Sequence, residues 1–162
     1  MVAITIAAGL PAATPARFCV GDYTTAGLRD GCADAVMCID AIQFGDPPLA
    51  GVTEARRILV PGGRLVLTTW EPVNPGGPAD ERLPERSQRM DLGRDLAEAG
   101  LEDIEVTVKP DWYAAERALW EAALAADADG DPALVSLQAE GTRSLQTHDL
   151  KRRVLATATA PR

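Results

Sequence analysis

The stretch E-A-R-R-I-L-V-P-G-G-R-L-V-L-T-T, residues 54–69, indicates the fold class of this chain. Its first part, residues 54–59, has the apolar pair Ile58 and Leu59 after Arg56 and Arg57, a pattern that fits the end of a helix. Residues 61–63, Pro-Gly-Gly, then end that helix, because proline lacks a backbone N–H and glycine tolerates a positive φ. Residues 64–69 are rich in Leu, Val and Thr, which suits a strand buried on both faces, as in a parallel sheet. Helix, tight turn and buried strand form one half of a βαβ unit.

The rest of the chain continues this alternation of short apolar runs and helical patterns. An apolar helix is predicted at residues 2–9, and short strands are predicted at residues 18–20 and 33–39. A helix at residues 49–59 leads into the stretch quoted above. Downstream, the pattern predicts helix, strand, helix, helix and strand at residues 91–99, 104–108, 111–126, 132–145 and 153–159. The sequence therefore predicts an α/β fold.

Charge and length restrict the class of protein. The chain has 162 residues, enough for one domain, with a net charge of −8 and a pI of about 4.6. Such acidity argues against sequence-independent nucleic-acid binding and against attachment to anionic membrane surfaces. No apolar run reaches the about 20 residues that span a bilayer. We therefore expect neither nucleic acid nor a membrane as a partner.

Cysteine usage and the N-terminal segment bear on location. The three cysteines, Cys19, Cys32 and Cys38, show no metal-ligand spacing and leave an odd count, which favours reduced thiols. The acidic turn at residues 127–131 has the aspartates of a calcium loop. However, the sixth position of such a loop is Pro132 rather than glycine, and the twelfth is Gln138 rather than glutamate, so no metal site is predicted. Residues 1–13 are apolar, but no Lys or Arg precedes them as in a signal peptide. These features together predict a cytoplasmic protein.

Two carboxylates follow predicted strands. Asp22 comes after the strand at residues 18–20, and Asp40 comes after the strand at residues 33–39. Open α/β sheets bind ligands at the carboxyl edge of their strands, so both side chains are candidates for contact with a ligand. Asp22 can accept a hydrogen bond from an amine, and Asp40 can orient an amine or a hydroxyl. The alternative is that each aspartate only caps a turn or a helix.

Trp70 and the segment behind it are a further candidate. Residues 71–84 form a loop rich in Pro and Gly, and a loop of this length in a compact domain is usually functional or disordered. Because Trp70 directly precedes this loop, we predict that both roof a substrate pocket. The alternative is that Trp70 packs in the core, where most tryptophan side chains are largely buried.

These motifs resemble a known family. E-A-x-R-x-L-x-P-G-G-x-L at residues 54–65 looks like the helix, turn and fifth strand of class I S-adenosylmethionine-dependent methyltransferases, and is similar to their type-eleven, small-molecule branch. V-G-D at residues 20–22, followed by D-G-x-A-D-A-V at residues 30–36, is similar to the family's adenine-binding motif and fourth strand. The resemblance implies S-adenosyl-L-methionine as cofactor and methyl transfer to a small molecule as function.

The resemblance also implies roles for particular residues. Asp22 matches the acidic residue that binds the adenine amine, and Tyr23 matches the next residue, which contributes backbone contacts. Asp40 falls where family members line the methionine end of the cofactor. The residues expected to line the substrate are Gln43, Phe44 and Trp70. Many relatives carry a histidine close to the position of Gln43, and glutamine cannot take a proton, so no catalytic residue is assigned.

The family's first two strands are not found in the sequence. The glycine-rich turn G-x-G-x-G and the following acidic strand end are absent, and residues 1–16 look like the helix that leads into the third strand. The family sheet order is 3-2-1-4-5-7-6, so the strand at residues 33–39 is expected to have an exposed edge. We therefore expect residues 1–162 to form a single partial methyltransferase domain, truncated at its N-terminus. Its C-terminal part is expected to be an antiparallel strand pair with a helical insertion.

Three hypotheses account for such a partial domain. The chain is a truncated version of a longer methyltransferase, a non-catalytic methyltransferase-like module for binding or interaction, or a module completed by a partner. The partner in the last hypothesis includes a second copy, as a homodimer or by strand swapping through the exposed edge. In each case the chain alone is expected to be a weak or inactive enzyme, because most cofactor contacts would be missing.

Overall fold

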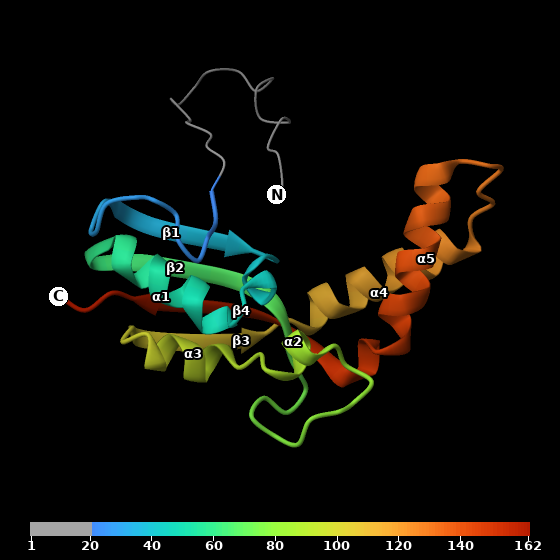
Figure 1. The fold of residues 1–162 in the computed structure, drawn as a ribbon. Helices are drawn as coiled ribbons and strands as arrows, with labels where there is room; N and C mark the ends of the chain where they lie inside the picture. Colours follow the sequence, from blue (N-terminus) through green and yellow to red (C-terminus); the bar gives the residue numbers. More distant parts are fainter. Residues whose placement is uncertain (1–20) are drawn as a thin grey trace.

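The computed structural model describes residues 21–162, which form one mixed sheet with helices (Figure 1). The helix predicted at residues 2–9 and the strand predicted at 18–20 lie outside the described residues. The sheet has four strands in the order β1-β2-β4-β3. Strand β1 pairs parallel with β2, and the other two pairings are antiparallel. The strands are β1 (Ala33–Ile39), β2 (Leu59–Pro72), β3 (Glu102–Val108) and β4 (Lys151–Thr159).

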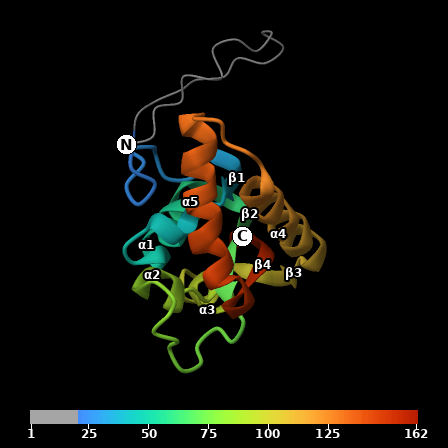
Figure 2. The ribbon, with the colours of Figure 1, turned by 90° about the vertical axis from the view of Figure 1, so that its right-hand side faces the viewer.

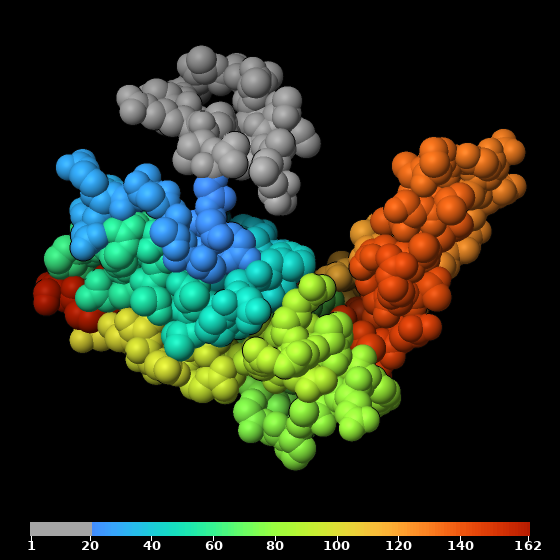
Figure 3. Space-filling model, in the orientation of Figure 1, coloured from blue at the N-terminus to red at the C-terminus, as the bar shows by residue number. Residues whose placement is uncertain are grey.

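The helices lie on one face of the sheet and beyond one of its ends. Helices α1 and α3 both cover the same face (Figure 1). Helices α4 and α5 form an antiparallel hairpin that stands away from the sheet, as the space-filling view shows (Figure 3). The helical elements are η2 (Ile42–Phe44), α1 (Pro48–Ile58), α2 (Glu85–Gln88), α3 (Leu92–Glu98), α4 (Pro110–Ala125), α5 (Pro132–Gln146) and η3 (His148–Leu150). None of the helices in residues 21–162 combines the length and apolarity that crossing a bilayer requires.

The predicted fold class is confirmed. The sheet order corresponds to the last four strands, 4-5-7-6, of the order expected from the resemblance. The antiparallel pair β3 and β4 is also present, with α4 and α5 inserted between its strands. Viewed from the end of the sheet, the two helices lie side by side (Figure 2). Gly141 of α5 allows this approach, because a Cβ atom there would lie 3.3 Å from the Trp120 ring.

The hydrophobic core lies between the sheet and helices α1 and α3. Leu65 and Leu67 of β2 and Val154 and Ala156 of β4 are fully buried on this face. Each pair is spaced by two residues, as expected for side chains on one side of a strand. The helices add Val52 from α1 and Leu92 and Leu96 from α3. Burial of this apolar surface is the main source of the sheet's stability.

The opposite face of the sheet and one of its edges are open. Within residues 21–162, β1 pairs only with β2. Met37 and Ile39, which alternate with the core-facing Val36 and Cys38, are 72% and 52% exposed. On β2, Arg64 is also exposed on this face. The prediction that residues 64–69 are buried on both faces is therefore wrong for the first part of that strand, because α1 and α3 pack on the other face.

The turn at residues 61–63 lies inside β2 rather than before it. Helix α1 ends at Ile58, and β2 begins at Leu59, earlier than predicted. Gly62 has a φ of 78°. A Cβ atom on Gly63 would lie 2.9 Å from the Val60 carbonyl oxygen and 3.1 Å from that of Asp34 in β1. Glycine at position 63 therefore allows β1 and β2 to approach each other.

Candidate functional site

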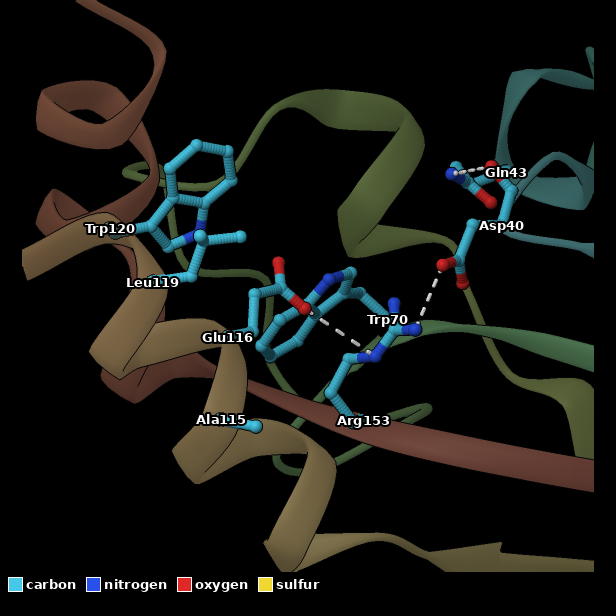
Figure 4. Close-up of a pocket in the computed structure, with 8 residues that line it drawn as sticks. All are labelled: Asp40, Gln43, Trp70, Ala115, Glu116, Leu119, Trp120 and Arg153. Carbon is cyan, nitrogen blue, oxygen red and sulfur yellow. Dashed lines mark hydrogen bonds and ion pairs between the residues drawn. The ribbon is translucent and has the colours of Figure 1, made fainter. Parts of the chain in front are cut away.

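A cavity of about 520 Å³ lies where the carboxyl ends of β1 and β2 meet the start of β4 and one side of α4 (Figure 4). It brings together three of the residues predicted to contact ligands: Asp40, Gln43 and Trp70. The other lining residues come from α4 and β4 and were not predicted: Ala115, Glu116, Leu119, Trp120 and Arg153. The cavity thus lies at the carboxyl edge of the sheet, as expected for an open α/β sheet.

Asp40 is held in one orientation at the end of β1. Its φ is 50°, a left-handed conformation that aspartate adopts more readily than most residues. Its backbone N–H donates to the Thr68 carbonyl oxygen at 2.9 Å, and its carboxylate accepts from the Thr68 hydroxyl at 3.0 Å. The other carboxylate oxygen accepts from Arg153 at 2.8 Å. The side chain therefore joins β1 to β2 and β4 and does not cap a helix.

Arg153 is the central cation of the cavity. Its side chain is only 10% exposed. Besides Asp40, its guanidinium lies 3.6 Å from the Glu116 carboxylate of α4 and 5.2 Å from the centre of the Trp70 ring. Figure 4 shows Arg153 between these three side chains. The antiparallel register of β2 and β4, which places Trp70 opposite Arg153, creates this arrangement.

Gln43 is also fixed by hydrogen bonds. Its side-chain amide donates to the Asp40 carbonyl oxygen at 2.7 Å, and its amide oxygen accepts from the Thr69 hydroxyl at 2.8 Å. Phe44, by contrast, does not line the cavity in Figure 4. It is 59% exposed, and the Arg86 guanidinium lies 5.1 Å from the centre of its ring. It borders a neighbouring cavity instead.

The roof of the cavity differs from the prediction. Trp70 is half-buried and lines the cavity, but α4, rather than the Pro- and Gly-rich loop, faces it. The reason is that β2 continues to Pro72, which pairs with Lys151 and carries the loop past the cavity. The loop borders a different depression, together with Asp149 and Leu150.

Asp22 and Tyr23 lie on a loop that packs against α1, and neither lines the cavity in Figure 4. One Asp22 oxygen, Oδ1, accepts hydrogen bonds from the Thr24 N–H at 2.8 Å and from its hydroxyl at 2.7 Å. These bonds hold the pKa of Asp22 below its usual value. The Tyr23 ring packs on α1, about where a side chain at Gly51 would be. The Asp22 carboxylate is exposed, so its position fits both a turn and a ligand contact.

Glu54 and Arg57, both within residues 54–69, hold this loop in place. The Glu54 carboxylate accepts from the Ala26 N–H at 2.7 Å and from Arg57. Arg57 in turn donates to the Leu28 carbonyl oxygen at 2.7 Å and pairs with Asp30. Burial of Glu54 opposes these contacts, but the bond to Arg57 dominates and lowers the pKa of Glu54. The loop that carries Asp22 is therefore attached to α1.

His148, to which the sequence assigned no role, is buried beside the cavity. It is 1% exposed, and its ring centre lies 4.0 Å from that of Tyr113 and 5.2 Å from that of Trp70. Neither ring nitrogen has a hydrogen-bond partner among residues 21–162. Burial lowers the pKa of His148, and the positive charges of Arg117 and Lys151 lower it further, while Asp149 and Glu121 oppose them.

This burial predicts a pH dependence of stability. Because the folded protein disfavours the charged imidazole, the unfolded chain takes up a proton first as the pH falls. The stabilisation is complete above the ordinary histidine pKa of about 6.5 and decreases below it, by at most about 1.4 kcal/mol per pH unit. His148 is the only histidine, so the His148→Phe variant should lose this slope in urea unfolding between about pH 7 and 5.5. Equal slopes for both proteins would contradict the prediction.

Comparisons with known proteins agree with the fold. Residues 3–67 match the model of a methyltransferase domain family. A phosphoethanolamine N-methyltransferase from Haemonchus contortus is similar at 21% identity, with a TM-score of 0.64 over 87% of this chain and 36% of that one. The [4+2]-cyclase SpnF is similar at 22% identity, with a TM-score of 0.58 over 89% of this chain and 55% of that one. A search of curated proteins gave no significant match.

A third solved structure is geranyl diphosphate C-methyltransferase from Streptomyces coelicolor A3(2). It is 16% identical, with a TM-score of 0.59 over 88% of this chain and 51% of that one. The chain thus spans between about a third and just over half of the length of these solved proteins. The resemblance to class I methyltransferases is confirmed by the family match and the shared fold.

Proposed function

We propose that this chain takes part in S-adenosylmethionine-dependent methyl transfer to a small molecule, within a longer or partner-completed domain. The observation that carries the proposal is the cavity at the carboxyl ends of β1 and β2, where Asp40 is held by Thr68 and Arg153. The methyltransferase family match supports S-adenosylmethionine as the cofactor. Solved neighbours named for small acceptors, phosphoethanolamine and geranyl diphosphate, support the substrate class.

The side chains have definable tasks in this proposal. S-adenosylmethionine supplies a methyl group on a sulfonium, which is already a good leaving group, so the protein has mainly to bind, align and exclude water. Asp22 Oδ2, which has no hydrogen-bond partner among the described residues, is available to the adenine amine. An aspartate carboxylate is ionised and an acceptor at neutral pH, and the hydrogen bonds from Thr24 lower the pKa of Asp22 further. Tyr23 adds backbone contacts beside it.

Asp40 and the cavity wall are assigned to the methionine part of the cofactor and to the methyl acceptor. Asp40 is 43% exposed, so its fixed carboxylate can accept a hydrogen bond from the cofactor's methionine part. Gln43 and Trp70 border the volume that we assign to the methyl acceptor. The Trp70 ring and Leu119 provide apolar surface, which keeps water away from an aligned acceptor. Phe44 is assigned to the outer margin of this acceptor region.

Completion of the domain is part of the proposal. Met37 and Ile39 form an apolar surface on β1, next to a strand edge without a partner among residues 21–162. Such edges pair readily with another strand. We propose that further strands, from a longer polypeptide or from a second copy, pair with β1 and supply the remaining cofactor contacts.

The alternative is a methyltransferase-like module that binds a ligand or partner without catalysis. The position of Asp22 and Tyr23 outside the cavity in Figure 4 favours this alternative. The similarity to a [4+2]-cyclase shows in addition that this fold occurs in a protein named for a reaction other than methyl transfer, so the fold alone does not fix the function.

Calorimetric titration with S-adenosylhomocysteine separates the two functions. If methyl transfer is the function, we expect saturable binding, weaker than micromolar for the chain alone. The Asp22→Ala variant should bind about tenfold more weakly, since hydrogen bonds to charged groups contribute about 1.5 to 3 kcal/mol. Asp34→Ala, which removes an exposed carboxylate from β1, is the matched control. No binding by a folded chain at millimolar ligand would favour the non-catalytic module. Micromolar binding together with a dimer in light scattering would favour completion by a second copy.

A further inference from the structure

A second cavity of about 430 Å³ adjoins the one in Figure 4. The two share Gln43, Trp70, Glu116 and Trp120 as walls, so one ligand can extend from the first cavity into the second. Beyond this shared wall, the second cavity is bordered by Arg86 of α2, by the last turns of α5, by His148 of η3 and by Lys151 at the start of β4. These residues have no part in the proposed methyl transfer.

The charges around the second cavity do not balance. Its two carboxylates are already engaged: Glu140 pairs with Arg143 at 2.6 Å, and Glu116 lies 3.6 Å from Arg153. Arg86 and Lys151 have no ion-pair partner within the described residues and instead lie 5.1 and 5.2 Å from the ring centres of Phe44 and Trp70. Two cations therefore border this cavity without a carboxylate of residues 21–162 in ion-pair contact with them, although Glu116 and Glu140 attract Lys151 from a greater distance.

Two further observations at the cavity wall favour a polar ligand. His148 is fully buried at the cavity wall, and neither of its ring nitrogens has a partner in residues 21–162. A buried polar group without a hydrogen bond costs about 1 to 3 kcal/mol, which a ligand oxygen could offset. Burial also lowers the pKa of the half-buried Lys151, against the attraction of Glu116 and Glu140. An anion at this position would stabilise its charged form.

We propose that the second cavity binds an anionic group, a phosphate or a carboxylate, carried by the molecule whose uncharged part occupies the first cavity. Arg86 and Lys151 supply the charge, His148 donates one hydrogen bond, and the Ser144 hydroxyl at the same wall is a further donor. Arginine and lysine are the side chains that bind such anions in proteins. This inference rests on the proposed function only in naming its substrate class.

The test uses phenyl phosphate, benzoate and phenol as probes, added to the full chain without any S-adenosyl compound. Binding is followed by the NMR shifts of the tryptophan indole N–H groups. We expect phenyl phosphate or benzoate to bind at least about tenfold more tightly than phenol, as for a charge-assisted contact. The tighter anion identifies the group that the cavity prefers. Phenol binding as tightly as both anions would overturn the proposal.

Variants locate the binding. Arg86→Met and Lys151→Met should each weaken the preferred anion by about tenfold, whereas Arg64→Met, which removes an exposed cation from β2, should not. Arg86 is exposed on a short helix, so its variant keeps the test valid if Lys151→Met fails to fold. An equal loss for Arg64→Met and Arg86→Met would show attraction to overall charge and would contradict the site. Failure to bind S-adenosylhomocysteine would contradict the proposed function alone.

Discussion

Replacing Glu71 by alanine should lower the free energy of unfolding by about 3 kcal/mol. Glu71 is 1% exposed near the end of β2. Its Oε1 accepts from the Leu92 N–H at 2.6 Å, at the start of α3, and its Oε2 pairs with Arg152 of β4 at 3.0 Å. The variant leaves a buried N–H without an acceptor and a cation without a partner. Because Arg152 is 30% exposed, the loss should be at the lower end of the range for broken buried ion pairs.

Urea unfolding followed by circular dichroism measures this loss. Glu71→Gln keeps an acceptor for Leu92 and loses only the charge, so it should lie between the wild type and Glu71→Ala. Glu98→Ala removes an exposed carboxylate from α3 and should change stability by no more than about 0.5 kcal/mol. A Glu71→Ala protein as stable as Glu98→Ala would show that Glu71 does not hold the three elements together.

Replacing Arg153 by methionine should lower stability by about 2 kcal/mol and loosen the wall of the cavity. Methionine keeps much of the apolar stem and removes the guanidinium that joins Asp40 to Glu116. The two carboxylates are 43% and 26% exposed, so water compensates part of the loss, and the effect stays below that of Glu71→Ala. Tryptophan fluorescence should also change, because the cation leaves the Trp70 ring.

A double-mutant cycle that combines Arg153→Met with Asp40→Asn measures the interaction between these two side chains separately from the effect of each substitution alone. We expect a coupling free energy of about 1 kcal/mol between the two positions, as for contacting charged groups. The matched single variant is Arg64→Met on the neighbouring strand, which should be near neutral. Strict additivity of Arg153→Met and Asp40→Asn would mean that the contact at 2.8 Å does not contribute to the site.

Local sequence signals predicted most of the fold. The strand at residues 33–39 has the predicted bounds, and the helix predicted at residues 91–99 is present as α3, where the Asp91 side chain accepts from the Arg94 N–H at the N-cap. Gly100, with a φ of 75°, follows the end of that helix, where a left-handed glycine commonly occurs. The bounds of this strand and the two ends of this helix are determined by residues close together in the sequence, which is why they could be predicted. The length of β2 was underestimated, because its start pairs with Ala33 of β1 and its end pairs with β4, which lies far along the chain.

The candidate site was only partly predictable, for the same reason. Asp40 and Gln43 follow β1 directly, so the strand pattern located them at the carboxyl edge. Arg153 and Glu116 reach the cavity through the register of β4 and the position of the α4–α5 hairpin, which no local pattern encodes. One signal was available: β4 is an apolar strand that begins with three consecutive basic residues. Basic side chains at a sheet's ligand-binding edge deserve consideration as site residues.

The measurement that tests the account most directly is a map of S-adenosylhomocysteine binding by two-dimensional NMR of the labelled chain, which detects even millimolar affinity. The account predicts shift changes at residues 21–24, in the loop that packs on α1, and at residues 40–43, which follow β1. Both sets of shift changes should be clearly smaller in Asp22→Ala. Asp34→Ala should leave the map unchanged. No shifts at any concentration, or shifts confined to the α4–α5 hairpin, would contradict a methyltransferase cofactor site in this chain.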